Sequence, residues 1–156
     1  MIEFTLVCIP LIFILISIVE LARGMWIYNT VAFSVRKATR YAAVHGSSCA
    51  AASSACPITV DAVAQVIRGS ATGIPPDQLS VVLQTTGTSL NCSPLNQCIG
   101  NASTWPPASD NSVGTAITIS CSYPFRSALA MFWPGAGKVN FSTLNLGAKS
   151  QEEIVF

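Results

Sequence analysis

Apolar residues dominate the first part of the chain and then give way to a regular apolar stripe. No charged residue occurs between Glu3 and Glu20. Beyond Glu20, apolar side chains recur every three or four residues, which is the spacing of one face of an α-helix. Because Gly46 is a typical helix-ending residue, we expect one helix from residue 1 to about residue 45, roughly 65 Å long. The predicted stripe comprises Leu21, Met25, Tyr28, Val31, Val35, Ala38 and Tyr41.

The uncharged run is best interpreted as a short membrane span. A cleaved signal peptide has a basic region before the apolar run and a small-x-small cleavage site after it, whereas nothing basic precedes this run and Glu20-Leu21-Ala22-Arg23 follows it. A buried helix of a globular protein has a similar length, but the rest of the chain offers no matching partner pattern. A span needs about 20 residues, which the run reaches if Leu21 and Ala22 are counted and Glu20 is tolerated.

The composition changes sharply after Gly46. Apolar residues make up 51% of the whole chain and charged residues only 10%, against about 25% charged in an ordinary soluble domain. The apolar excess lies in the N-terminal segment, and the remainder is polar and interrupted by Gly and Pro. The chain therefore divides into a stem, residues 1–46, and a head domain, residues 47–156.

The head pattern predicts one helix and a small antiparallel sheet. A helix is expected over residues 59–70 and a turn over residues 73–77. Alternating apolar and polar positions predict three strands, with a further extended piece at the end of the chain. The fold class is therefore α+β, a long N-terminal helix packed on a sheet. The strands are expected at 79–85, 114–123 and 139–146, a long loop at 91–111, and the extended piece at 154–156.

Five of the six cysteines lie in the head, which favours an oxidising compartment and at least one disulfide. Short separations favour Cys49–Cys56 and Cys92–Cys98, because short loops close easily. Cys121, on a predicted strand, is then expected to be a free thiol. Cys8 lies in the apolar run, where it acts as a small hydrophobe.

Nothing in the sequence predicts an enzyme, a cofactor or a metal site. The chain has one histidine, His45, at the predicted end of the helix, and no C-x-x-C pair. The formal net charge is +1, and the basic cluster of Arg36, Lys37 and Arg40 lacks the interleaved aromatics of a nucleic-acid surface. We therefore expect no nucleic-acid partner.

The segment Pro124–Pro134 is unusually apolar for a connection between strands. Phe125, Leu129, Phe132 and Trp133 either fold back over the sheet as core or form a patch for a neighbouring subunit. The sequence leaves both alternatives open.

Several motifs in the stem occur together in one known family. Glu3-Phe4 opens the apolar helix, Pro10 follows, and Glu20 and Arg23 stand three residues apart at its end. The stem closes with Lys37-Ala38-Thr39-Arg40-Tyr41-Ala42-Ala43. This combination resembles the TadE-like pseudopilins, relatives of type IV pilins in the tight-adherence (Tad) pilus system. The resemblance resumes in VGTAITISCSYPF and VNFSTLNLGAKSQEE, which are similar to a strand and a closing strand with an acidic tail.

The resemblance implies a structural subunit of a bacterial surface filament. Such proteins lie in the inner membrane, are trimmed by a prepilin peptidase, and are assembled by pilus machinery into a helical filament of copies of themselves. A second interpretation is a minor pseudopilin, or a single-pass inner-membrane assembly component with a periplasmic binding head. In type IV pilins the comparable glutamate is usually the fifth mature residue. Here it is the third, which implies that two residues precede Met1 or that cleavage falls at an unusual place.

The predicted assembly surface lies on the stem. We expect residues 4–19 to contact the same segment of other copies, because a helix that is apolar all round has no face for water. Glu3 either lies at the membrane surface or pairs with a positive group of a neighbouring copy, namely an amino terminus or Arg23. The predicted contact residues are Glu3, Phe4, Leu6, Val7, Pro10, Leu11, Phe13, Ile14, Ile18, Glu20 and Arg23.

Overall fold

A computed structural model describes residues 2–46, 58–127 and 143–155. Helix α1 spans Ile2–Ala43 and helix α2 spans Val60–Ser70. The four strands are β1 (Ser80–Gln84), β2 (Ser89–Cys92), β3 (Ala116–Phe125) and β4 (Leu144–Glu153). Two short 3-10 turns, η2 (Leu95–Gln97) and η3 (Ala108–Asp110), lie in the loop between β2 and β3. The predicted α+β fold is confirmed.

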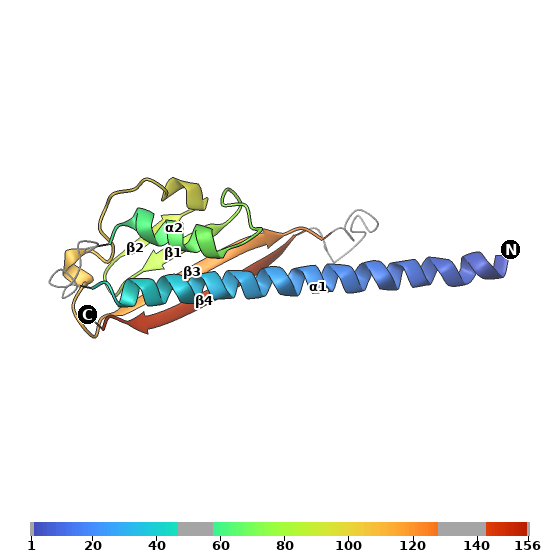
Figure 1. The fold of residues 1–156 in the computed structure, drawn as a ribbon, viewed down its shortest axis with the longest axis horizontal. Helices are drawn as coiled ribbons and strands as arrows, with labels where there is room; N and C mark the ends of the chain where they lie inside the picture. The colour runs from blue at the N-terminus through green and yellow to red at the C-terminus, as the bar shows by residue number, and fades with distance from the viewer. Residues whose placement is uncertain (1, 47–57, 128–142, 156) are drawn as a thin grey trace.

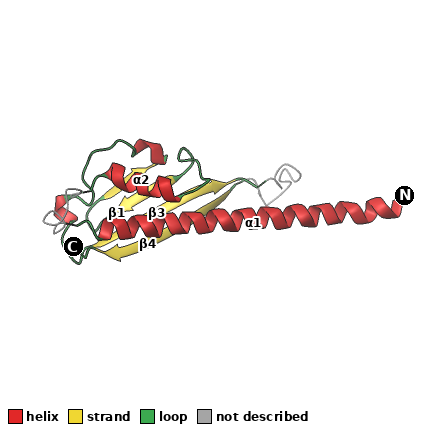
Figure 2. Ribbon diagram, in the orientation of Figure 1, coloured by secondary structure: helices red, strands yellow, loops and turns green. Residues whose placement is uncertain are grey.

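Figure 1 shows that α1 runs along most of the length of the molecule. Its C-terminal half lies along the head, and its N-terminal half projects beyond the head with no other described element beside it. Helix α2 lies alongside the C-terminal half of α1, and Figure 2 shows the strands behind the two helices. With 42 residues, α1 is roughly 63 Å long at about 1.5 Å per residue. Pro10 lies inside this one continuous helix.

The sheet is antiparallel throughout, with the strand order β2-β1-β3-β4. Its register brings apolar side chains of neighbouring strands opposite one another: Leu83 of β1 faces Leu90 of β2 and Ile119 of β3, and Val81 faces Cys121. Because side chains alternate along a strand, these positions share one face. Val81, Leu83, Ile117, Ile119 and Cys121 are all buried, and they form the sheet side of the core.

The head packs on α1 along a narrow stripe. Ile27, Val31, Val35, Ala38 and Ala42 are buried at steps of four or three residues, the spacing of one helix face. Ser34 and Thr39 are buried beside them, and each hydroxyl donates a hydrogen bond to a carbonyl of its own helix, so neither buried group lacks a partner.

The head covers the predicted stripe from Val31 onward and leaves its earlier positions exposed. Leu21, Met25 and Tyr28 are each about half exposed or more, and Ile27 takes the buried position. Leu21 lies before the first head contacts, which are at Arg23 and Gly24, whereas Met25 and Tyr28 lie at the level of the head but on sides of α1 that it leaves exposed. Apolar periodicity identifies a helix face, but it does not say where along the helix the covering begins.

Helix α2 begins where it was predicted. The Thr59 hydroxyl accepts a hydrogen bond from the backbone N–H of Ala62 and so caps the first turn. Asp61 lies in that turn, where a negative charge suits the helix dipole. Its apolar face is buried, and it consists of Val60, Val63, Ala64 and Ile67, as expected.

The strand predictions needed three corrections. Strand β2 was missed and lies partly in the predicted 91–111 loop, because its four residues include a single large apolar side chain. Strand β3 continues through Pro124 to Phe125, into the segment interpreted as a connection. The third predicted strand, 139–146, is displaced: β4 begins at Leu144 and includes the sequence interpreted as an acidic tail. Residues 139–142 lie outside the described part of the chain.

The end of the chain is attached to the end of α1. The backbone N–H of Val155 donates to the carbonyl of Ala43, and Arg40 forms an ion pair with Glu152 at 3.4 Å. His45 Nδ1 lies 2.7 Å from the carbonyl oxygen of Tyr41. This histidine therefore interacts with a free helix-end carbonyl, consistent with a structural role.

Candidate assembly surface

The N-terminal half of α1 is an exposed apolar surface on all sides. Between Phe4 and Val19, eleven large apolar side chains are about half exposed or more. Within the described part of the chain, one helix, α1, is long and apolar enough to cross a membrane. It can serve as a membrane anchor. The predicted contact residues in this exposed region are Phe4, Leu6, Val7, Pro10, Leu11, Phe13, Ile14 and Ile18. Four equivalent positions that the prediction omitted are Ile9, Ile12, Leu15 and Val19.

The structure brings Glu20 and Arg23 together at the stem–head junction. Arg23 Nη1 lies 3.3 Å from Glu20 Oε1, an ion pair between residues one helical turn apart. The Arg23 guanidinium also lies over the ring of Phe125, 5.0 Å from its centroid. The ring also lies close to Gly24, the residue after Arg23. Phe125 is therefore buried at the junction between head and stem, which for this residue agrees with the core alternative that the sequence left open.

One oxygen of the Glu20 carboxylate lacks a hydrogen-bond partner in the part of the chain that the structure describes. The side chain is only 11% exposed, and Oε2 is buried without a hydrogen bond among the described residues. A half-paired carboxylate costs free energy in an apolar environment. The Glu20–Arg23 pair therefore marks the point where the apolar stem meets the polar head.

The side chains of Ile2, Glu3 and Thr5 lie outside the described part, as do Leu129, Phe132 and Trp133 of the apolar connection. The partner of Glu3 stays a prediction. Arg23, one of its two expected partners, already contacts Glu20 and Phe125 within its own chain.

The predicted disulfide Cys92–Cys98 is present and connects the end of β2 to the residue after η2. Cys121 is a buried free thiol, as expected, and burial raises its pKa to about 12. Cys49 and Cys56 lie outside the described residues, so their pairing stays a prediction.

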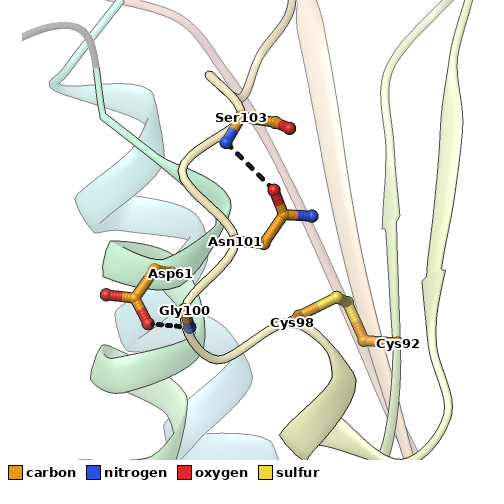
Figure 3. Close-up of a disulfide and its surroundings, with 6 residues drawn as sticks. All are labelled: Asp61, Cys92, Cys98, Gly100, Asn101 and Ser103. Carbon is orange, nitrogen blue, oxygen red and sulfur yellow. Dashed lines mark hydrogen bonds between the residues drawn. A yellow bond between two sulfur atoms is a disulfide. The ribbon is translucent and has the colours of Figure 1, made fainter.

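The loop after the disulfide docks onto the start of α2 (Figure 3). The N–H of Gly100 donates to the Asp61 carboxylate at 2.7 Å, and the N–H of Val60 donates to the carbonyl of Ser103 at 2.8 Å. Asn101 Oδ1 accepts from the N–H of Ser103. The loop therefore supplies hydrogen-bond partners to the first turn of α2. The disulfide restrains the chain just before this loop, so fewer residues have to become ordered when the loop docks.

Replacing both Cys92 and Cys98 by Ser should lower the free energy of unfolding of the head by about 2 kcal/mol, from the loop-closure entropy of a ring of about seven residues. Urea denaturation of the oxidised full-length chain in detergent measures this. Cys8→Ser is the control and should leave the midpoint unchanged, because Cys8 lies in the stem. Equal midpoints for the double variant and the control would contradict the assigned role.

Asp110 organises the tip of the β1–β2 hairpin. Its carboxylate accepts hydrogen bonds from the hydroxyls of Thr85 and Thr88 and from the N–H of Gly87. The Thr85 hydrogen bond is the largest cause that lowers the pKa of Asp110 below its ordinary value of 3.8. This contact could not be predicted from the sequence, because Asp110 lies more than 20 residues from the hairpin.

Because the folded-state pKa of Asp110 is lowered, its contribution to stability is complete above pH 3.8 and is lost as the pH falls through the folded-state value. Asp110→Asn should therefore be less stable than the unmodified chain at pH 6, and the difference should shrink as the pH falls below about 4. Urea midpoints measured from pH 6 to pH 2 test this expectation. A difference that stays constant across the range would exclude the ionised carboxylate as its source.

The arrangement of an exposed apolar stem and a separate head agrees with a comparison of this sequence with known protein families. Residues 1–40 match the TadE-like protein family. The match confirms the predicted resemblance over the stem, and it associates the chain with the Tad pilus, a structural rather than an enzymatic system. It covers every predicted contact residue from Glu3 to Arg23 and ends just before Tyr41. No curated protein and no solved structure matched the chain.

Proposed function

We propose that this chain is a structural subunit of a bacterial Tad-type pilus, which assembles through its N-terminal helix into a helical surface filament. The observation that carries the proposal is the exposed apolar half of α1, which no other described element of the chain covers. The TadE-like match over the same segment supports it.

The size of the exposed surface explains why the stem needs partners. Burying one large apolar side chain contributes about 1.5–3 kcal/mol. Eleven such side chains lie between Phe4 and Val19, and the helix itself already covers part of each, so covering the rest contributes on the order of 15 kcal/mol. Lipid can cover this surface before assembly, and the stems of other copies can cover it afterwards. The same surface thus supports both stages, in the inner membrane and in the filament.

The two halves of α1 have different roles in this proposal. The inner half supplies the contacts between copies in the filament core, and the outer half already has a partner in its own head through Val31, Val35 and Ala38. The heads therefore remain outside the core. A glutamate near the start of the stem sets the axial register, since a buried carboxylate left unpaired costs several kcal/mol. Because Arg23 is engaged within its own chain, we favour the amino terminus of a neighbouring copy as the partner of Glu3.

Before assembly, the head lies outside the inner membrane, and the prepilin peptidase and the pilus machinery act on the stem. The disulfide of the head is consistent with an oxidising compartment. Afterwards the subunit is part of an extracellular filament.

The test is the location and abundance of the chain in its own cells. Filaments are sheared from the surface, washed without detergent, and labelled with a gold-conjugated antibody against the head. The proposal predicts that this chain is a major component of the sheared material and that gold decorates filaments along their length. Retention of the chain in the inner membrane, with unlabelled filaments, would favour a machine component with a periplasmic head instead.

A further inference from the structure

We infer that the stem–head junction is a membrane-interface belt, in which Trp26 and Tyr28 hold the base of the head against the outer surface of the lipid bilayer before assembly. The partner is the headgroup layer of a bilayer. This inference rests on the membrane stage of the proposed function, and it adds the depth at which the chain lies in the membrane.

The length of the exposed apolar segment gives this depth. Phe4 to Ala22 is a helical segment of about 28 Å at about 1.5 Å per residue, close to the roughly 30 Å of a hydrocarbon core. Arg23 follows immediately, and its guanidinium is paired with Glu20 and lies over the Phe125 ring. A charged pair with an aromatic neighbour suits the edge of the hydrocarbon better than its centre.

The exposed aromatic side chains lie at the next level. Trp26 is 52% exposed and Tyr28 49% exposed, and their backbone positions lie about 6 and 9 Å beyond Ala22. Helical side chains lean toward the N-terminus, which here brings both rings closer to the membrane. The headgroup layer on each side is about 5–8 Å thick, and Trp and Tyr are the residues enriched in it.

The head touches α1 at this same level. Gly73 follows α2 with a positive φ of 79°, and a Cβ atom there would lie 2.9 Å from Cη2 of Trp26. The Trp26 indole therefore packs directly on the backbone of the turn after α2. At the end of β3, Phe125 packs against Gly24. In Figure 1, the end of β3 and the start of β4 point toward the free half of α1. The base of the head thus lies at the level of the two aromatic side chains, so an anchor at Trp26 also positions the head.

Three positions on α1 provide a depth scale. Phe13 lies at the middle of the Phe4–Ala22 segment, Trp26 at the proposed interface, and Phe33 two helical turns beyond Trp26, about 10 Å farther out. The full-length chain is reconstituted in phosphatidylcholine vesicles with lipids brominated either near the carbonyl ends or near the middle of the acyl chains. Trp26→Phe supplies the background fluorescence of the other tryptophans. Phe13→Trp and Phe33→Trp are each made in the Trp26→Phe chain.

After subtraction of the background, we expect Trp26 to be quenched more by the shallow bromines than by the deep ones. Phe13→Trp should give the reverse order, and Phe33→Trp should be quenched by neither. Absence of quenching of Trp26, or stronger quenching by the deep bromines, would overturn the inference while leaving the span intact if Phe13→Trp is still quenched. A Phe13→Trp chain that neither lipid quenches would overturn the proposed membrane stage as well.

Discussion

Phe13→Asp should weaken membrane insertion and strongly impair assembly, whereas Phe33→Asp should leave both nearly unchanged. An aspartate at the centre of a span costs about 2.5–3.5 kcal/mol, and the phenylalanine that it replaces is favourable by a few tenths. The resulting change of about 3–4 kcal/mol shifts the insertion equilibrium on the order of several hundredfold. In a filament core, the same carboxylate would be buried without a partner.

The control places the same substitution at a second phenylalanine whose side chain has a similar exposed fraction. Phe13 is 46% exposed and Phe33 58% exposed, and both lie on α1. Phe33, however, lies on the head half of α1, and Arg36 and Lys37 follow it by three and four residues, so an aspartate there gains favourable neighbours. Alkaline extraction of membranes measures insertion, and the yield of sheared filaments measures assembly. Equal behaviour of the two variants would show that the apolar half of α1 has no special role.

Leu83→Ala should lower the free energy of unfolding of the head by about 2–5 kcal/mol. Leu83 lies in the central part of the sheet at 2% exposure, opposite Leu90 and Ile119, so the substitution leaves a cavity. The loss is a large fraction of the roughly 5–15 kcal/mol by which a typical domain is stable. Urea denaturation of the full-length chain in detergent, followed by near-ultraviolet circular dichroism, reports on the head.

The matched control is Leu144→Ala, at the first position of β4. Leu144 is 54% exposed, and surface substitutions of this kind usually change stability by no more than about 0.5 kcal/mol. If the two alanine variants had the same midpoint, β1 would not lie in the core as described.

The elements that the sequence predicted well are those with a strong local signal. Helix α1 combines an uncharged run, a continuous periodicity and a terminal Gly46, and α2 has a capping threonine before its apolar face. Strand β3 alternates over most of its length. The Cys92–Cys98 disulfide was predicted from a short separation, although spacing alone leaves several pairings open.

The wrong predictions concern segments whose structure depends on tertiary contacts. Strand β4 is an edge strand with most of its side chains partly or fully exposed. Its Lys149–Glu153 half is therefore polar in composition, which is why the sequence was interpreted as a tail. Strand β2 is too short to show a periodicity. Leu21, Met25 and Tyr28 continue the apolar pattern of α1 at positions that the described part of the head leaves exposed, and the sequence does not show which apolar positions of a helix the rest of the chain will cover.

Only part of the candidate site could be predicted from the sequence. The apolar stem and the Glu20–Arg23 pair follow from residues close together in the chain. The contacts of Arg23 with Phe125, of Trp26 with Gly73 and of Asp61 with Gly100 join residues that lie far apart in the sequence. A single sequence contains no signal for such pairs, and the fold is needed to bring them together.

The most direct test of the central claim is a photo-cross-link from the stem within the assembled filament. A benzophenone amino acid is placed at Phe13, the filaments are sheared from the cells and irradiated, and the adducts are mapped by mass spectrometry. Assembly through α1 predicts a covalent dimer joined to residues 4–19 of a second copy. Adducts formed with lipid alone, or with a different protein while no dimer forms, would contradict a filament core built from these helices.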